Sequence, residues 1–266
     1  MIDFNVLFLC AGYGTRLNRD LDEAGSGSKY YSMLKGLPKA LLPVNGPVLL
    51  DHWLDSCLLE HISKDRIHLV CNHHFYPAFK QWATKRDIQN VLDDGTTSNI
   101  TRLGAVRDIL VAVEHFNLFS KPLLVIAGDT LFMRDFSFKS FIDSTVASQS
   151  LVTSYTVAHD QDTLKTGIIE LDDSRRVVGF LEKPGPSETK SRCACPCFYW
   201  LDPIGLDLLK EFVAVHRNAP LAEIDASGKF ISWLISKHAV YAYAISGRLD
   251  IGGLSSYIDA EQYMQS

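Results

Sequence analysis

A glycine-rich segment with one arginine has the composition of a phosphate-binding loop. Leu9-Cys-Ala-Gly-Tyr-Gly-Thr-Arg-Leu17 overlaps the end of the apolar run Phe4–Ala11, which is predicted as a buried strand. Open α/β sheets bind ligands at the carboxyl ends of their strands, and glycines there let backbone N–H groups approach a phosphate. The segment is therefore a candidate anion site after the first strand.

Two familiar phosphate-binding patterns do not fit this loop. Leu17 stands where the dinucleotide fingerprint has its third glycine, and Asn72 and His73 follow the second strand where that fingerprint has an acidic residue. The P-loop needs Gly-Lys-Ser/Thr, and Leu17 and Asn18 occupy that place. The sequence disfavours a nicotinamide-binding fold and excludes a P-loop.

A carboxylate follows a second buried strand. Gly128-Asp129-Thr130 comes directly after Leu123–Ala127, an all-apolar run typical of a strand covered on both faces. Gly-Asp is also a common turn dipeptide. The position at the carboxyl end of a central strand indicates a function more than a packing role.

Two motifs follow each other in the first fifty residues: Leu-x-Ala-Gly-x-Gly-Thr-Arg-Leu at residues 9–17, and Pro-Lys-x-Leu-x-Pro-Val-x-Gly at residues 38–46. In this order they resemble the signature of the sugar-phosphate nucleotidyltransferases, such as glucose-1-phosphate thymidylyl- and uridylyltransferases. The resemblance implies that Arg16 and Lys39 are catalytic residues that bind the triphosphate and the transferred phosphate. It also implies nucleotide contacts along the loop, from Leu9, Ala11, Gly12, Gly14 and Thr15.

The resemblance extends to a metal site. Arg248-Leu-Asp250-Ile-Gly252 is similar to the Asp-x-Gly segment that completes this site in the family. Mg²⁺ prefers hard oxygen ligands and keeps several waters, so two carboxylates and triphosphate oxygens suffice to hold it. Asp129 and Asp250 are the expected ligands, and Asp129 is counted with the catalytic residues.

A third motif, Glu182-Lys183-Pro184, implies a site for the acceptor substrate. In the family the lysine contacts the acceptor phosphate and the glutamate a sugar hydroxyl; taken alone, Glu-Lys is an ordinary exposed pair. Gly167, in a strand that resembles the one facing the sugar, and Tyr199 are the other expected substrate-binding residues.

The region expected to read the base departs from the common pattern. Thymidylyl- and uridylyltransferases usually have a Gln followed by Pro-x-Gly here, whereas residues 92–106 are faintly similar to glucose-1-phosphate cytidylyltransferases. Thr and Asn side chains offer both donors and acceptors to a pyrimidine edge, although helix caps use the same residue types. CTP and UTP are the leading nucleotides, and the expected contacts are Asp94, Thr97, Asn99 and Gly104.

The resemblance implies a Mg²⁺-dependent transfer of NMP from a nucleoside triphosphate to a sugar 1-phosphate, with release of pyrophosphate. A phosphate dianion can attack without a dedicated general base, so the lack of a nucleophile triad is no objection. One alternative is a cytidylyltransferase acting on phosphocholine or a phosphonate. Another is a catalytically silent, nucleotide-sugar-binding regulatory subunit, which would be free to lose Arg16, Lys39, Asp129 or Asp250.

The apolar pattern predicts one α/β domain over residues 1–266, with a doubly wound, mostly parallel Rossmann-like sheet of the nucleotide-diphospho-sugar transferase type. The nucleotide-binding part is expected at about 1–150, and the acceptor-binding part, with a smaller sheet, at about 151–266. Other expected strands are Ile67–Cys71, Leu151–Val157, Thr166–Leu171, Val177–Glu182, Cys197–Leu201 and Val240–Ile245. Expected helices are Pro47–Glu60, Arg102–Phe116, Phe138–Ala147, 203–214, 225–237 and Leu254–Met264.

Composition limits the class of protein. With 266 residues, 47% hydrophobic, the chain can bury a full core, and its net charge of −5 disfavours nucleic acid and anionic lipid as partners. No apolar run approaches the roughly 18 residues that span a bilayer. We expect a soluble cytoplasmic protein, and a homodimer remains open.

Two segments have no assigned role in this scheme. Cys193, Cys195 and Cys197 alternate along an extended run, which favours packing on a strand over a zinc clamp. The 17–38 segment makes the Arg16–Lys39 spacing longer than in common bacterial members of the family. Leu21–Ser32 is polar and Gly/Ser-rich, and the extra piece, around Asp20–Ser32, fits either a mobile lid or an ordinary polar insertion.

Overall fold

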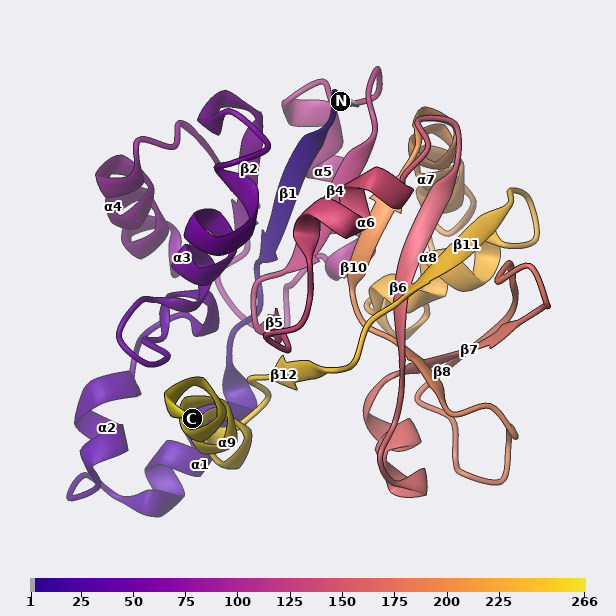
Figure 1. Ribbon diagram of the computed structural model, residues 1–266. Helices are drawn as coiled ribbons and strands as arrows, with labels where there is room; N and C mark the ends of the chain where they lie inside the picture. Colours follow the sequence, from indigo (N-terminus) through magenta and orange to yellow (C-terminus); the bar gives the residue numbers. More distant parts are fainter. Residues whose placement is uncertain (1–2) are drawn as a thin grey trace. The chain divides into compact units, whose positions relative to one another are not determined.

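A computed structural model describes residues 3–266 of the chain (Figure 1). The chain folds into two compact units, neither of which is continuous in sequence. The larger unit contains the segment ending at Leu7, Leu103–Ile126 and Arg134–Gly247, and the smaller unit contains Phe8–Arg102, Ala127–Met133 and Arg248–Ser266.

The smaller unit combines helices with two short pairs of strands. Strands β2 and β3 run parallel, with Leu69 opposite Val91, and β12 pairs antiparallel with β5, with Asp250 opposite Thr130. The end of β1 (Asn5–Cys10) also belongs to this unit. Its other elements are α1 (Thr15–Ala24), α2 (Lys29–Leu34), α3 (Leu49–Trp53), β2 (Ile67–Cys71), α4 (Tyr76–Arg86), β3 (Asn90–Asp93), β5 (Thr130–Phe132), β12 (Arg248–Asp250) and α9 (Leu254–Gln265).

Helix α3 anchors strand β5. The Trp53 indole is 2% exposed, its Nε1 donates to the Thr130 carbonyl at 2.8 Å, and its ring meets Phe132 edge-on at 5.3 Å. A buried tryptophan whose N–H is also bonded combines a large apolar contact with a directional one. The start of β5, next to Asp129, is therefore held in a fixed position.

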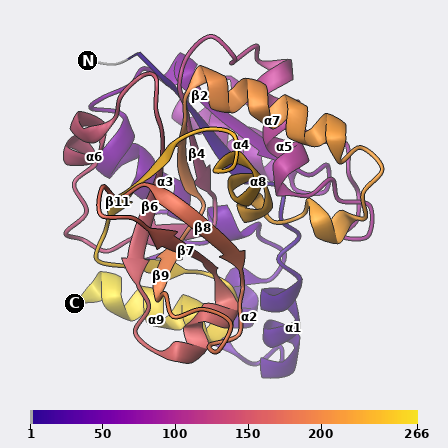
Figure 2. The same ribbon diagram turned by 90° about the vertical axis from the view of Figure 1, so that its right-hand side faces the viewer.

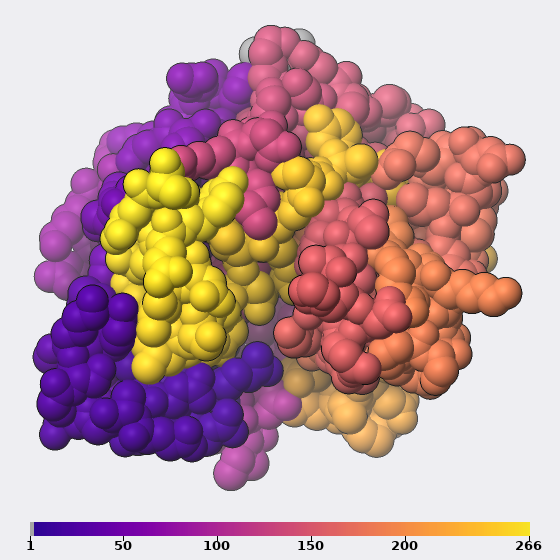
Figure 3. Space-filling model, turned by 60° about the horizontal axis from the view of Figure 1, so that its bottom comes forward, coloured from indigo at the N-terminus to yellow at the C-terminus, as the bar shows by residue number. Residues whose placement is uncertain are grey.

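The 17–38 segment is mostly helical and packs against the C-terminal helix. The polar stretch Leu21–Ser32 contains the last turn of α1, a turn at Gly25 and the start of α2, where the Ser28 side chain accepts from the Tyr30 N–H. Tyr30 meets Tyr257 of α9 edge-on at 6.1 Å, and the Leu254 N–H donates to Asp20 at 3.0 Å. Figures 1 and 3 show α9 (yellow) beside the N-terminal helices (indigo).

The larger unit is a mixed sheet with helices. Its strands are hydrogen-bonded in the order β4-β10-β6-β9-β7-β8, with β11 parallel to β6 (Figure 2). Its elements are α5 (Ala105–His115), β4 (Leu123–Ala127), α6 (Phe138–Ser144), β6 (Ser150–Thr156), β7 (Gly167–Leu171), β8 (Val177–Glu182), β9 (Cys193–Cys195), β10 (Phe198–Leu201), α7 (Pro203–Val215), α8 (Ser227–Leu234) and β11 (Val240–Ala244).

Asp202 caps α7, as the sequence predicts. Its carboxylate accepts from the Gly205 N–H at 3.2 Å, and Pro203 occupies the first turn, where its missing N–H needs no partner. The Ser150 hydroxyl and His238 Nε2 also contact Oδ1, at 2.6 and 3.1 Å. These contacts fix the start of α7 against β6.

The mixed α/β class is confirmed, and the apolar runs were located to within a few residues. Ile67–Cys71, Leu123–Ala127 and Val177–Glu182 agree with the strands residue for residue. Among residues 3–266, no helix is long and apolar enough to cross a membrane.

Candidate active site

The glycine loop leads directly into α1. Gly14 precedes the helix with a φ of 62°, a backbone conformation that glycine adopts at little cost. The buried Asn72 side chain fixes the loop from the end of β2: its Nδ2 donates to the Ala11 carbonyl at 2.9 Å, and its Oδ1 accepts from the Phe75 N–H at 3.0 Å. Asn72 is thus a positioning residue for the loop.

Replacing Asn72 by alanine is expected to lower the free energy of unfolding by about 1–3 kcal/mol, because buried backbone groups lose their partners. Denaturant titration measures this change. Asn90→Ala is the matched control, because its amide bonds carbonyls at the start of β2, far along the strand from the loop. Equal, small losses in both variants would contradict a special role for Asn72.

Lys39 and Asp129 are brought together from distant parts of the sequence. Lys39 begins a short 3₁₀ turn, Lys39–Leu41, and its Nζ lies 3.4 Å from Asp129 Oδ2. Their side chains are 19% and 37% exposed, so both are within reach of a ligand while partly shielded from water. The two residues that the motifs single out therefore form one charged pair.

The backbone around Asp129 is tightly held. The Gly128 N–H donates to the Leu9 carbonyl at 2.9 Å, and a Cβ on Gly128 would lie 2.6 Å from Cys10 Sγ. On the other side, the Ile251 N–H donates to the Asp129 carbonyl at 2.9 Å. Only glycine fits between β1 and Asp129, which explains the Gly-Asp dipeptide by packing.

Asp250 lies beside Asp129 at the end of β12. Its carboxylate forms an ion pair with Arg248, whose Nη1 lies 3.1 Å from Asp250 Oδ1. Burial raises the pKa of Asp250, and the nearby Asp129 charge raises it further, while Arg248, Lys39 and Arg16 act in the opposite direction. The two carboxylates thus sit close enough to repel each other.

Arg16 reaches the same place from the first turn of α1. A Cβ on Gly252 would lie 2.9 Å from Arg16 Nη1 and 3.1 Å from Asp250 Oδ2. The missing side chain of Gly252 therefore lets the guanidinium approach the carboxylate. Four charged residues predicted from separate motifs, Arg16, Lys39, Asp129 and Asp250, converge within the smaller unit.

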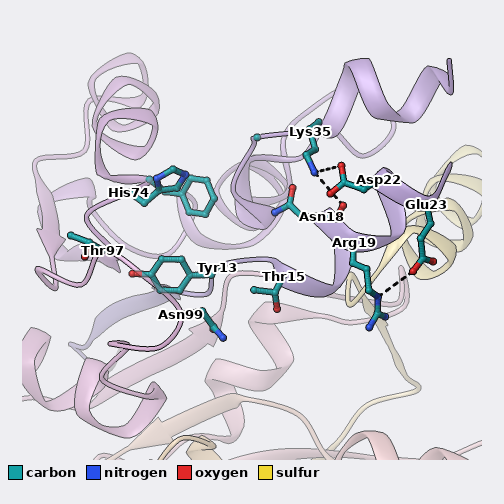
Figure 4. A pocket seen from close by; sticks show the side chains of 12 residues that line it. Tyr13, Thr15, Asn18, Arg19, Asp22, Glu23, Lys35, His74, Thr97 and Asn99 are labelled. Carbon is teal, nitrogen blue, oxygen red and sulfur yellow. Dashed lines mark hydrogen bonds and ion pairs between the residues drawn. The ribbon is translucent and has the colours of Figure 1, made fainter. Parts of the chain in front are cut away.

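A pocket of about 920 Å³ opens beside the glycine loop (Figure 4). Tyr13 and Thr15 of the loop line it, as do Thr97 and Asn99 from the segment after β3. The Tyr13 hydroxyl lies 2.8 Å from Thr96 Oγ1 and joins the two segments. Two of the predicted base-reading side chains thus share one pocket with the loop.

Asp94 and Gly104 have structural roles that the sequence did not reveal. The Asp94 carboxylate accepts from the Thr96 N–H at 2.7 Å and shapes the turn after β3. Gly104 belongs to the larger unit, where its φ is 91° and a Cβ would lie 2.9 Å from the Asp225 backbone. Neither residue lines the pocket, and a nucleotide contact by either stays a prediction.

The predicted acceptor-binding residues belong to the larger unit. Glu182 lies opposite Gly167 in the β7–β8 register, and burial raises its pKa, while Lys183 and Lys229 lower it. The buried Tyr199 has its hydroxyl 3.2 Å from Ser227 Oγ, and burial raises its pKa well above the usual value. Gly167 makes room for the Phe180 ring, 2.4 Å from where a Cβ would be, so packing alone accounts for this glycine.

The three clustered cysteines are free thiols in and after β9. Cys195 is buried, and burial raises the pKa of Cys193. In the part of the chain that the structure describes, no group of three or more His, Cys, Asp or Glu residues is arranged to hold a metal ion. The contacts of Cys193 and Cys195 are those of strand residues.

Comparison with known proteins places the chain in a family. The model for the nucleotidyl transferase family matches residues 23–266. The chain therefore belongs to the nucleotidyl transferases, and the resemblance stated from its motifs is confirmed at this level.

Curated relatives share about a quarter of their aligned residues with this chain. It is 24% identical over 216 residues to the bifunctional protein GlmU of Methanococcus maripaludis, covering 80% of this chain and 44% of that protein. The GlmU of Methanococcus vannielii is 23% identical over 246 residues, covering 90% of this chain and 53% of that protein. The chain thus spans about half the length of these relatives.

Solved structures share the fold at low sequence identity. A protein assigned as a glucose-1-phosphate thymidylyltransferase from Bacillus anthracis, in complex with sucrose, has a TM-score of 0.70 at 19% identity, covering 98% of this chain and 94% of that one. A UDP-glucose pyrophosphorylase complexed with UDP-glucose has a TM-score of 0.69 at 18% identity, covering 100% and 99% of the two chains. The Rossmann-like α/β architecture expected from sequence is therefore confirmed.

Proposed function

We propose that this nucleotidyl transferase joins NMP from CTP or UTP to a sugar 1-phosphate and releases pyrophosphate. One observation carries the proposal: Arg16, Lys39, Asp129 and Asp250 converge beside the glycine loop, with Lys39 Nζ 3.4 Å from Asp129 Oδ2. Their charges are those that a triphosphate and a divalent cation need. The names of the relatives, which include UDP-glucose pyrophosphorylase, support a sugar phosphate as acceptor.

The carboxylate pair suits Mg²⁺. The Ile251 N–H, next to Asp250, donates to the Asp129 carbonyl, and the pKa of Asp250 is raised first by burial and further by the Asp129 charge. A hard dication bound by both would remove that repulsion. When bound, Mg²⁺ would neutralise charge on the triphosphate oxygens.

The protein's own residues would act mainly by position and charge. Backbone N–H groups of the glycine loop would bind the phosphates, and Arg16 and Lys39 would stabilise the negative charge that develops as the α-phosphorus passes from pyrophosphate to the acceptor oxygen. The acceptor phosphate is largely a dianion near neutral pH and can attack directly. Lys183 would bind that phosphate, and Glu182 a sugar hydroxyl.

A matrix of substrates tests the proposal. The protein is incubated with Mg²⁺, each of five nucleoside triphosphates, and a panel that includes sugar 1-phosphates, phosphocholine and a phosphonate, and pyrophosphate is measured. We expect release to depend on a sugar 1-phosphate and to be fastest with CTP or UTP. Pyrophosphate release only with phosphocholine or the phosphonate would show that one of these, and not a sugar 1-phosphate, is the acceptor substrate. Tight nucleotide binding with no product would indicate a regulatory subunit.

Lys183→Ala is expected to raise the KM for the acceptor about tenfold, because a charge-assisted bond to phosphate is lost. The KM for the nucleotide should not change. Lys190→Ala, an exposed lysine of the same unit, is the control. A change in nucleotide KM alone would contradict the assignment of Lys183 to the acceptor.

A further inference from the structure

The pocket beside the glycine loop has a second wall, formed by the 17–38 segment. This wall consists of Asn18, Arg19, Asp22, Glu23, Lys35 and Gly36 (Figure 4). The facing residues include Tyr13 and Thr97, which belong to the proposed nucleotide site. A ligand held by the loop would therefore lie next to the segment.

Lys35 is held in this wall with one donor to spare. Its Nζ donates to Asp22 Oδ1 at 2.5 Å and to the Asn18 carbonyl at 3.3 Å. A lysine ammonium has three N–H donors, so these contacts leave one for a ligand. The side chain is 30% exposed, and it passes over the Tyr31 ring, with Nζ 5.6 Å from the ring centroid. The ammonium is thus pre-positioned on the pocket wall.

The acidic residues of the wall do not oppose an anionic ligand. Asp22 is paired with Lys35, and Glu23 lies 3.8 Å from Arg19 Nε. Each carboxylate that lines the pocket therefore has a cation within salt-bridge distance, and Arg19 also pairs with Asp20 at 3.4 Å. Hydrogen-bond donors of the wall, such as the Lys35 ammonium, can therefore bind an oxygen of the ligand.

We infer that the 17–38 segment forms part of the nucleotide site, and that Lys35 is a nucleotide-binding residue that donates a hydrogen bond to an oxygen of the nucleotide. The inference rests on the proposed function and assigns a role to the segment that lengthens the Arg16–Lys39 spacing. The nucleotide oxygen that accepts this hydrogen bond belongs to a phosphate or to a base carbonyl. Both present the same chemistry to an ammonium.

Direct binding of UTP and CTP to the wild-type protein and to Lys35→Met, without an acceptor substrate, tests the inference. Methionine keeps the apolar stem and removes the charge. We expect the Kd for the better nucleotide to rise about five- to twentyfold, as for one charge-assisted bond at a partly exposed site. The KM for the acceptor substrate should stay the same, because the lost hydrogen bond is to the nucleotide. Lys35→Gln is the second variant, to be used if the Lys35→Met protein does not fold.

Lys29→Met is the matched control. Lys29 lies on the same segment, with its Nζ 4.7 Å over the Tyr30 ring, and does not line the pocket. Unchanged affinity in Lys35→Met, or an equal loss in Lys29→Met, would overturn the inference. Failure of the wild-type protein to bind either nucleotide would instead overturn the proposed function.

Comparing the binding of UTP, UMP and uridine distinguishes a hydrogen bond to a phosphate oxygen from one to a base carbonyl. A Lys35→Met effect limited to UTP, or to UTP and UMP, supports a phosphate oxygen. An effect of similar size with all three supports the base. No effect with any of them contradicts a bond from Lys35 to the nucleotide.

Discussion

Lys39→Ala is expected to lower kcat by about a hundred- to a thousandfold, because it removes a fixed cation that stabilises the negative charge developing on the transferred phosphate. The fold should be retained, since the Lys39 side chain is partly exposed and its pairing with Asp129 contributes little to stability. Steady-state pyrophosphate release and thermal unfolding measure the two effects separately.

Lys64→Ala is the control for this experiment. Lys64 also pairs with an aspartate of the same unit, Asp87, at 3.9 Å, but lies outside the proposed site. Its replacement should leave kcat within about twofold of wild type. A Lys39→Ala enzyme with wild-type pyrophosphate release would rule out the proposed role of the charged pair.

Asp250→Asn is expected to remove the response to Mg²⁺. Mg²⁺ should raise the unfolding temperature of the wild-type protein by mass action and should raise that of the variant far less. Turnover at fixed Mg²⁺ should fall about a hundredfold or more, because a ligand that neutralises the triphosphate is lost.

The same variant has a second, opposite effect in the absence of metal. The pKa of Asp250 is raised in the folded protein, so its ionisation destabilises the fold once the pH exceeds the unfolded pKa. The amide of the Asp250→Asn variant carries no charge and avoids this cost at neutral pH, so the metal-free variant should unfold at a temperature no lower than wild type. A clear loss of stability without metal would contradict a raised pKa of Asp250 in the folded protein.

The sequence predicts best where a local pattern determines the structure. Leu123–Ala127 is apolar throughout, because it is buried on both faces, and its bounds agree with β4. The end of such a strand fixes where Asp129 must lie. Three-residue β12 has no periodicity of its own, and Asp250 was found only through a family motif.

Contacts between distant segments were beyond prediction. Nothing near Asn72 in the sequence indicates that its amide bonds Ala11, or that the Trp53 indole bonds Thr130. The helices of the 17–38 segment were missed for a related reason. Few of their residues are buried, and these helices pack against α9, which lies at the other end of the chain.

At Gly104 and Gly167, packing by itself already requires a glycine. Both were expected at a ligand, yet each glycine is already required by a close contact, with Asp225 and Phe180 respectively. Because glycine has no side chain, the sequence does not show whether a packing contact or a ligand requires it. Lys39 is more informative, because a charged side chain that is only 19% exposed needs a partner or a ligand.

The fate of the nucleotide's phosphates tests the central claim most directly. CTP or UTP labelled at the α- or the γ-phosphate is incubated with the protein, Mg²⁺ and a sugar 1-phosphate. Nucleotidyl transfer predicts the α-label in a nucleotide–sugar product and the γ-label in pyrophosphate, in equal amounts. Transfer of the γ-label to the acceptor, or its release as free phosphate, would contradict the account.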